Sequence, residues 1–359
     1  MPTGGMIATR FMELRKRRGL MIALILVNIG IPTIFLTVRL IAHAVAPRSY
    51  APAGGYDIFT NLVAGVMYVF GFIVAATLGC TAGSVDLTEG MFRHLVVTGR
   101  SRLALYLARI PAGLAIVVPL VAIGFTIVCT VCVAAAPTKL YYEGAAVPAG
   151  LSRSAFLAWA GEHPVYVLCD LPGPVPGNLA CPNGSSNGGP VIRGGGPSSG
   201  GSGQPSAAVL KAAAIENAAH DYPGYAATFL APSVPLMIDS GLWIELEALI
   251  GFAVGLGLAS LMGQRTVPVV LMIVLELILT PILSTSVIPH VINLQRGVVG
   301  LAMAHLEPGG LPLAFGGNSR GAGVSQLVPE STAIAVCVVL AWLVGWTALG
   351  AWRMMTRDA

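Results

Sequence analysis

Residues 59–81 read FTNLVAGVMYVFGFIVAATLGCT, a run without one charged side chain. A bilayer core about 30 Å thick needs about 20 mostly apolar residues per helix, because no water is present there to satisfy a bare backbone. This stretch therefore predicts a membrane-spanning helix. Five further segments meet the same criterion, with the boundaries 20–43, 110–133, 242–262, 267–283 and 332–352.

The composition of the whole chain agrees with six spans. Hydrophobic residues make up 55 % of the 359 residues and charged residues only 10 %, against roughly 25 % charged residues in soluble domains. So few charges could hardly coat globular units of this length in water, which excludes a soluble enzyme. The apolar run of span 20–43 exceeds the roughly 7 to 15 residues of the apolar region of a signal peptide, so we expect an uncleaved first helix.

The distribution of Lys and Arg predicts the orientation, because these residues concentrate in short cytoplasmic loops. With both termini inside, 12 of the 20 basic residues fall in short inner segments, and the others are spread over much longer outer loops. We therefore expect an all-α, multi-pass protein of the plasma membrane with cytoplasmic termini. Helices 1–3 then occupy residues 1–135, an extracytoplasmic loop or cap occupies 136–235, and helices 4–6 occupy 236–359.

The predicted outer loop contains a segment whose composition does not support a folded hydrophobic core. Residues 173–203 hold 11 Gly and 5 Pro, a composition that buries too little apolar surface to offset chain entropy. We expect a flexible insert there, between locally helical stretches at 154–161 and 207–219. Cys169 and Cys181 flank its start, and an extracytoplasmic compartment permits disulfides. Two cysteines are a weak pattern, so a bond between them and two free thiols both remain open.

Residues 287–306 are apolar but include Pro289, His290, Gln295 and Arg296, and are too polar to span comfortably. Their apolar residues lean to one side of a helix. Two interpretations stay open: a half-helix that lies in or dips into the outer membrane face, and a short surface helix.

Motifs for catalysis are missing from the sequence. It contains no G-x-x-x-x-G-K-[ST], no H-E-x-x-H and no G-x-S-x-G, so no P-loop, zinc-protease or hydrolase signature predicts a reaction centre. The six histidines are scattered, without metal-ligand spacing. We expect no intrinsic catalytic site, no cofactor or metal held by this chain, and no nucleic-acid partner.

Ionisable groups at membrane depth are the next candidates, since burying one costs about 2.5 to 3.5 kcal/mol at a helix centre. Glu276 lies near the middle of the fifth predicted span, and either a structural pairing or a place in a translocation path explains it. Glu245 and Glu247 lie near the outer end of the fourth span and Arg39 near that of the first. For these three, we expect side chains that extend to the interface.

The connection after the second span, residues 83–109, reads GSVDLTEGMFRHLVVTGRSRLALYLAR. Asp86 followed by Glu89 indicates a helix N-terminal capping box, and Gly99 is placed to end that helix. Apolar residues form one face of the helix, while Asp86, Glu89 and Arg93 project from another. We expect a short amphipathic helix on the inner membrane face. A mere connecting helix is the alternative.

This connection resembles the cytoplasmic loop of ABC-2 type permeases, the type V exporter-like membrane subunits of ABC transporters. That family has a Glu-x-x-x-Gly-Thr-x-Arg-x-Leu-Leu run, a Pro/Gly-x-Ser-Arg turn and a basic residue that starts the next helix. Here Met91 replaces the common Thr, and Arg109 the common Lys. The resemblance extends to the basic amphipathic start at 10–18, the tight turn at 263–265 and the outer half-helix at 287–306 (re-entrant in the family).

The resemblance implies a coupling helix in loop 83–109 that contacts a separate ATPase subunit, present in two copies with ATP and Mg²⁺ bound to it. A second permease chain, identical or similar, would complete the complex among membrane lipids. Drugs, antibiotics, peptides or lipid-like molecules would be exported. The implied ATPase-facing and supporting residues are Asp86, Glu89, Arg93, His94, Arg100 and Arg102.

Two other classes are weighed against the exporter. An ion-coupled carrier would need an inverted repeat and a central broken-helix ion site, and no repeat is visible. A ligand-sensing or enzymatic polytopic protein that uses the extracytoplasmic loop is the main alternative.

Overall fold

The computed structural model describes residues 3–47, 50, 52–88, 101–137, 139–142, 145–148, 150–170, 206–229, 231–284, 294–309, 311 and 330–356. Glu89, Arg93, His94, Arg100, Cys181 and the insert 173–203 lie outside these residues. The chain divides into two compact units. The helical unit comprises Met1–Val38, Phe59–Val131 and Ser233–Ala359, and the second unit comprises Arg39–Ile58 and Cys132–Pro232.

Six helices of the described chain are long and apolar enough to cross a membrane, as the sequence predicts. They run over Arg18–Val45, Tyr56–Asp86, Arg102–Ala134, Val234–Met262, Thr266–Leu283 and Thr332–Thr356. Large apolar side chains such as Ile34, Phe35 and Leu340 stand exposed along them. In water such surfaces would be an aggregation liability, whereas in a bilayer they meet lipid. The chain therefore has the character of a multi-pass membrane protein.

These spans are built from helical pieces, several of which contain a short π-helical stretch. The first three spans comprise α2 (Arg18–Ile25), η1 (Leu26–Gly30), α3 (Ile31–Val45), α4 (Tyr56–Asn61), η2 (Leu62–Met67), α5 (Tyr68–Thr88), α7 (Arg102–Leu107) and α8 (Arg109–Ala134). The last three comprise α12 (Val234–Met262), α13 (Thr266–Val274), η3 (Leu275–Leu279), α14 (Thr280–Ser284) and α16 (Thr332–Thr356). The amphipathic α1 (Gly4–Lys16) precedes them, and the short α15 (Val299–His305) lies before α16.

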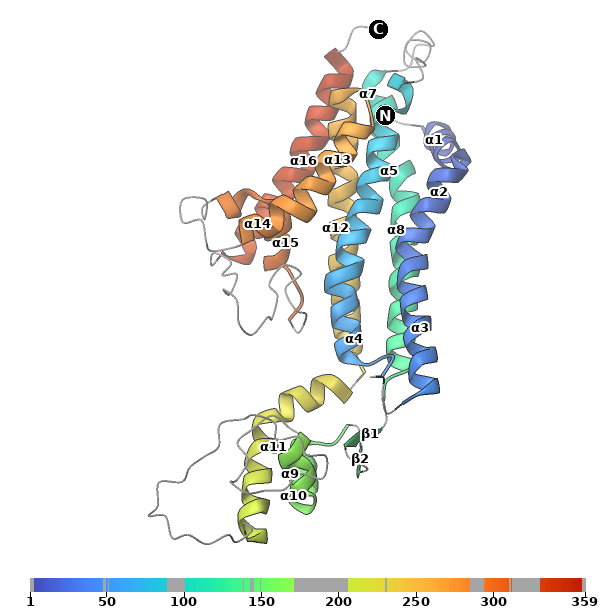
Figure 1. The fold of residues 1–359 in the computed structure, drawn as a ribbon. Helices are drawn as coiled ribbons and strands as arrows, with labels where there is room; N and C mark the ends of the chain where they lie inside the picture. Colours follow the sequence, from blue (N-terminus) through green and yellow to red (C-terminus); the bar gives the residue numbers. More distant parts are fainter. Residues whose placement is uncertain are drawn as a thin grey trace. The chain divides into compact units, whose positions relative to one another are not determined.

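Helices α5 and α12 form the centre of the helical unit, side by side (Figure 1). Glycines at four-residue spacing allow their backbones to touch. A Cβ atom built on Gly83 would lie 2.6 Å from the Leu256 carbonyl oxygen, and one on Gly251 would lie 2.8 Å from that of Phe72. Such small-residue faces replace the hydrophobic effect as the reason for helix association inside lipid. On its other side α12 packs against α16.

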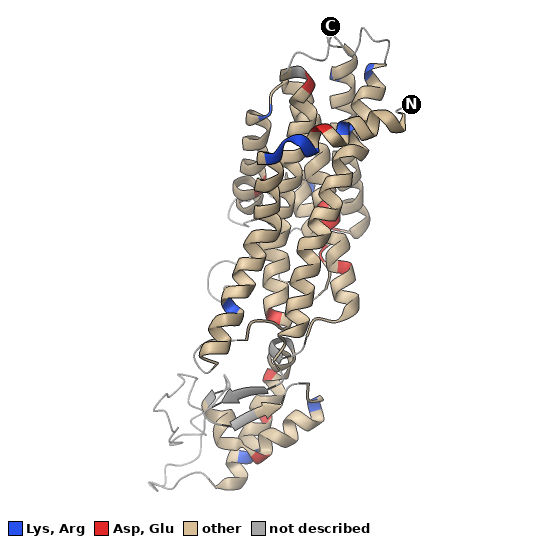
Figure 2. Cartoon of the chain, turned by 90° about the vertical axis from the view of Figure 1, so that its right-hand side faces the viewer, with Lys and Arg blue, Asp and Glu red and all other residues tan. Residues whose placement is uncertain are grey.

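The helix α1 and the last turn of α16 lie at the same end of the helical unit (Figure 1). Met6 packs against Ala104 and Leu105 of α7, and Arg102 donates a 3.0 Å hydrogen bond to the Met355 carbonyl. Lys and Arg gather towards this end, and acidic side chains also occur further along the unit (Figure 2). We call the end of the helical unit where α1 and the last turn of α16 lie the terminal end. Here the turn between α12 and α13, which contributes to the family resemblance, is closed by Gly263 at φ 72°.

The half-helix before the sixth span is short and buried. The described part is α15, in which the residues from Val299 to Ala304 are all buried, and it packs against α14 and α16. A surface helix would expose one face, so that interpretation of 287–306 is wrong for α15. The re-entrant alternative stays a prediction, and residues 287–293 lie outside the description.

The second unit is helical with one small sheet. Strands β1 (Lys139–Tyr142) and β2 (Ala145–Pro148) pair antiparallel, with Leu140 opposite Val147. This pairing departs from an all-α prediction. Helices α9 (Arg153–Glu162), α10 (Pro164–Asp170) and α11 (Ala207–Phe229) pack around Phe156, which stacks on Tyr225 at 4.1 Å between ring centroids. Helices α9 and α11 confirm the local helices predicted at 154–161 and 207–219.

Candidate functional site

Three buried charged residues meet at the terminal end of the helical unit, and we call them the Arg–Asp–Arg cluster: Arg10, Asp86 and Arg109. Arg10 donates to both carboxylate oxygens of Asp86, each at 2.6 Å. Arg109 donates to Asp86 Oδ2 at 2.5 Å and to the Gly83 carbonyl at 3.0 Å. The cluster therefore ties α1, α5 and α8 together through one carboxylate.

The electrostatics of the cluster follow from its burial. Asp86 is 0 % exposed and Arg109 2 % exposed, and an isolated charge at either position would carry a large desolvation cost. Burial alone would lower the pKa of Arg10, but the Asp86 carboxylate and Glu13 outweigh it and raise that pKa. Arg10 also pairs with Glu13 at 2.7 Å, which brings a second carboxylate to the two guanidinium groups.

The prediction for Asp86 is wrong on two points. Helix α5 continues without a break to Thr88, so Asp86 lies inside the helix and does not cap a new one. Its side chain is enclosed by Arg10 and Arg109 and is not available to an ATPase. Arg102 begins α7 with Ser101 as its N-cap and bonds to the end of α16, which agrees with a supporting role. Glu89, Arg93, His94 and Arg100 lie outside the described residues.

A second set of buried charges lies within the helical unit, and we call it the carboxyl pair: Glu247 of α12 and Glu276 of η3. Both residues are 0 % exposed. Among the described residues, neither carboxylate oxygen of Glu276 has a hydrogen-bond partner. Glu247 interacts with the Tyr68 hydroxyl and, electrostatically, with Glu276. No other place in the described chain brings two fully buried glutamates together.

Aromatic and backbone groups enclose the carboxyl pair. Tyr68 and Trp243 stack at 4.6 Å between ring centroids, and the Tyr68 hydroxyl lies near both glutamates. This hydroxyl donates to the Gly300 carbonyl over a long 3.4 Å, while Trp243 donates to the Met303 carbonyl at 2.9 Å. These two hydrogen bonds hold α15 against α5 and α12, directly beside the carboxyl pair.

Local structure explains how Glu276 reaches this position. Residues Leu275–Leu279 are π-helical, and the Thr280 hydroxyl donates to the Leu275 carbonyl five residues earlier at 2.9 Å. A π-helical turn shifts the side chains that follow it and recurs at functional sites. A Cβ atom on Gly300 would lie 3.3 Å from Glu276 Oε2. The same Cβ atom would lie 2.9 Å from Thr280 Cγ2, so a side chain larger than glycine at this position would crowd both Thr280 and Glu276.

Further ionisable groups lie near the pair on the α15 side. Glu307 interacts with Tyr68, and burial raises the pKa of Glu307 to about 8. His305 faces Glu330 at 3.7 Å between Nε2 and Oε2.

Sequence reasoning identified Glu276 but missed its partner. The expectation that Glu247 extends to the interface is wrong, because its side chain is enclosed in the unit. Glu245, two residues away, lies on another side of α12 and is half-buried. The sequence places Glu245 and Glu247 at about the same depth in the fourth predicted span, so depth alone could not distinguish them. The glycines at 251 and 255, four and eight residues after Glu247, were the signal that this helix face packs against another helix.

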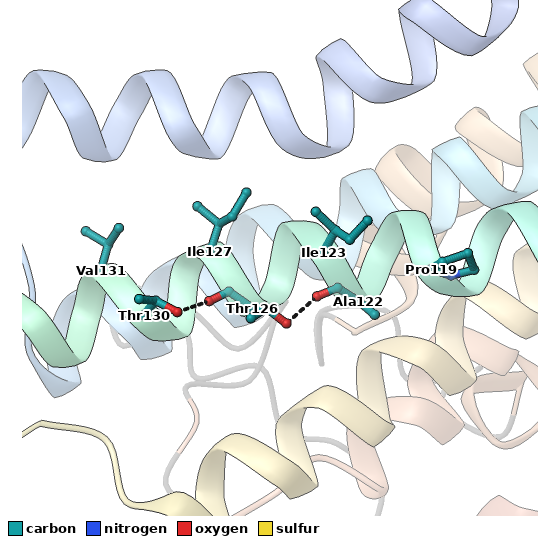
Figure 3. Close-up of a pocket in the computed structure, with 7 residues that line it drawn as sticks. All are labelled: Pro119, Ala122, Ile123, Thr126, Ile127, Thr130 and Val131. Atoms are coloured by element: carbon teal, nitrogen blue, oxygen red, sulfur yellow. Dashed lines mark hydrogen bonds between the residues drawn. The ribbon is translucent and has the colours of Figure 1, made fainter.

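The groove along α8 and the cysteine side chains are weaker candidates for a functional site. A groove of about 470 Å³ runs along α8, where Ile123, Ile127 and Val131 line an apolar surface. The hydroxyls of Thr126 and Thr130 are bonded back to the Ala122 and Thr126 carbonyls, so the lining presents little polar chemistry to a ligand (Figure 3).

Cysteine and metal chemistry is also limited. Cys80, Cys129, Cys132 and Cys337 are not in disulfide bonds, and Cys169 is disulfide-bonded. Its predicted partner, Cys181, lies outside the described residues. Among the described residues no group of three or more His, Cys, Asp or Glu side chains could hold a metal ion.

Comparison with other proteins does not extend these observations. No protein-family model, curated protein or solved structure matches the chain.

Proposed function

We propose that this chain is the membrane-spanning permease subunit of an ABC exporter, powered by a separate ATPase. The observation that carries the proposal is the Arg–Asp–Arg cluster, which stands at the base of the 89–100 connection. In this proposal the connection is the coupling helix, with Glu89, Arg93 and His94 towards the ATPase. ATP and Mg²⁺ would be bound by that partner.

The cluster gives the coupling helix a mechanical route into the spans. A displacement of residues 89–100 acts on the end of α5 and on α7, which flank that segment. Asp86 sits two residues before the end of α5 and is bonded to α1 and α8. Buried charge-assisted hydrogen bonds resist separation, because an unpaired charge would remain in an apolar site. The three elements would therefore move as one body when the ATPase closes.

The proposed orientation places the terminal end in the cytoplasm of a plasma membrane. The concentration of Lys and Arg at that end supports it (Figure 2). The second unit then lies outside, where the disulfide at Cys169 is chemically favoured. Two permease chains, identical or similar, would complete the path, and drugs, antibiotics, peptides or lipid-like molecules are the proposed cargo. The carboxyl pair is the candidate polar contact along the translocation path.

Charge reversal tests the proposed contact. E89K and R93E are introduced singly and together, and transport-coupled ATP hydrolysis is measured in membrane vesicles that also contain the candidate ATPase. We expect each single variant to lose most of the stimulation, because like charges would then face the partner. E162K on α9 is the matched control, since Glu162 is exposed and belongs to the second unit. Full stimulation in both single variants would reject residues 89–100 as the contact and would favour a sensor or enzyme.

A further inference from the structure

The carboxyl pair poses an electrostatic problem that the fold itself must solve. Glu247 and Glu276 come from two different elements, α12 and η3, and both side chains are fully buried. Two carboxylates that share a buried site cannot both be ionised without a strong mutual repulsion. Each also carries the cost of a charge in an apolar environment. Something must therefore compensate at least one of the two negative charges.

Three kinds of group can compensate a buried carboxylate: a cationic side chain, several hydrogen-bond donors, or a proton. Among the described residues, the ion pairs of Lys, Arg and His involve other carboxylates. Hydrogen-bond donors are scarce: among the described residues the Tyr68 hydroxyl interacts with Glu247, and the two oxygens of Glu276 have no hydrogen-bond partner. A proton needs no additional space, and it removes the negative charge of the carboxyl group that binds it.

We propose that Glu247 and Glu276 form a proton-binding site inside the helical unit, in which the two carboxyl groups hold one proton between them at neutral pH. The bound proton leaves a single negative charge on the pair. This inference rests on burial and geometry and does not depend on the exporter proposal.

The groups that face the pair set its response to pH. Tyr68 faces it from α5, and Glu307 acts on the same tyrosine from the segment after α15. His305 and Glu330 form a further titratable pair beyond Glu307. Helices α13 and α14 carry no ionisable side chain. Among the described residues named here, all but His305, which pairs with Glu330, are acidic or neutral, and an acidic neighbour favours a bound proton.

The position of α15 makes the site sensitive to conformation. Gly300 lies against Glu276, and Tyr68 and Trp243 bond to the α15 backbone. If α15 moved away, water would reach the carboxyl groups and stabilise their ionised form. Proton release and displacement of α15 are thus expected to be coupled.

Infrared spectroscopy of the purified protein tests this inference directly, because a protonated carboxyl group has a C=O stretching band that a carboxylate lacks. The spectra of the native chain, E247Q, E276Q and the double variant E247Q/E276Q are compared at neutral pH. E245Q is the matched control on the same helix. We expect the native protein and E245Q to show a protonated-carboxyl band that the double variant has lost.

The single variants distinguish a shared proton from two independent ones. In E276Q, Glu247 no longer faces a second carboxylate, so its band should disappear at a lower pH than the native band does. The same shift is expected for Glu276 in E247Q. Circular dichroism and gel filtration establish that each variant is folded. A native spectrum with no band attributable to the pair at neutral pH would overturn the inference, and so would single variants that titrate as the native protein does.

Discussion

Arg10 and Asp86, which lie 76 positions apart in the sequence, form a two-pronged ion pair in which both guanidinium nitrogens donate at 2.6 Å. Arg109, the first residue of α8, pairs with the same carboxylate. One aspartate thus pairs with two arginines, Glu13 supplies a second negative charge to Arg10, and the amphipathic α1 is held to the spans by a buried ion pair. This relationship underlies both the proposed coupling route and the first prediction.

Replacing Asp86 with Asn should destabilise the protein severely. The substitution leaves Arg10 and Arg109 buried without their shared carboxylate, and breaking a buried ion pair in this way costs about 3–5 kcal/mol. Thermal unfolding in detergent measures the effect. E13Q is the control, because Glu13 is partly exposed and its loss should cost at most about 1 kcal/mol. Equal unfolding temperatures for D86N and E13Q would contradict the structural role of the cluster.

The contact between α5 and α12 predicts a sharp difference between two glycines. G83A places a methyl group 2.6 Å from the Leu256 carbonyl oxygen, and overpacking of this kind costs about 1–3 kcal/mol. G345A on α16 is the control, because a Cβ atom there has no neighbour within 4 Å. We expect a lower unfolding temperature for G83A alone. If G345A is at least as destabilising, the close approach of α5 and α12 does not exist.

Glu307 predicts part of the pH dependence of stability. Burial raises the pKa of this carboxyl group from its ordinary 4.5 to about 8. The folded state therefore favours the protonated form, and the stability it contributes is fully present below about pH 4.5 and lost as the pH rises towards 8. E307Q should flatten the decline in unfolding temperature over this window. A native and a variant curve of equal slope would show that Glu307 is not buried in this way.

The disulfide at Cys169 predicts that the second unit lies in an oxidising, extracytoplasmic compartment. We expect peptide mapping of the protein, alkylated in intact cells before lysis, to find Cys169 joined to Cys181 in a disulfide. A bond at this position requires an oxidising compartment, as the proposed extracytoplasmic placement supplies. Cys80 should be recovered as a thiol, because it forms no disulfide and is buried in the helical unit. A reduced Cys169 in the same preparation would argue against an outer location.

The spans were predictable from sequence because each depends on a local run of apolar residues. The helices α9 and α11 were predictable for the same reason, since short-range sequence pattern decides them. Asp86 was misjudged because the end of α5 is set by partners 76 and 23 residues away, Arg10 and Arg109. A local capping motif was outweighed by two long-range ion pairs.

Depth in a span likewise could not separate Glu247 from Glu245. Both glutamates lie at about the same level of α12, and which of them is enclosed depends on the face that packs against α5 and on the position of α15. Those are tertiary contacts, visible in sequence only through the glycine spacing of α12. The partnership of Glu247 with Glu276 depends further on the π-helical turn of η3, which hydrophobic periodicity does not reveal.

Co-purification tests the central claim most directly. The chain is extracted from its native membrane in mild detergent, isolated by an affinity tag, and assayed for bound subunits and ATP hydrolysis. We predict that a P-loop ATPase subunit accompanies it, with two copies for every two permease chains, and that the E89K/R93E variant loses that subunit while E162K retains it. Isolation of the intact chain alone, without a nucleotide-binding subunit or ATPase activity, would contradict the account.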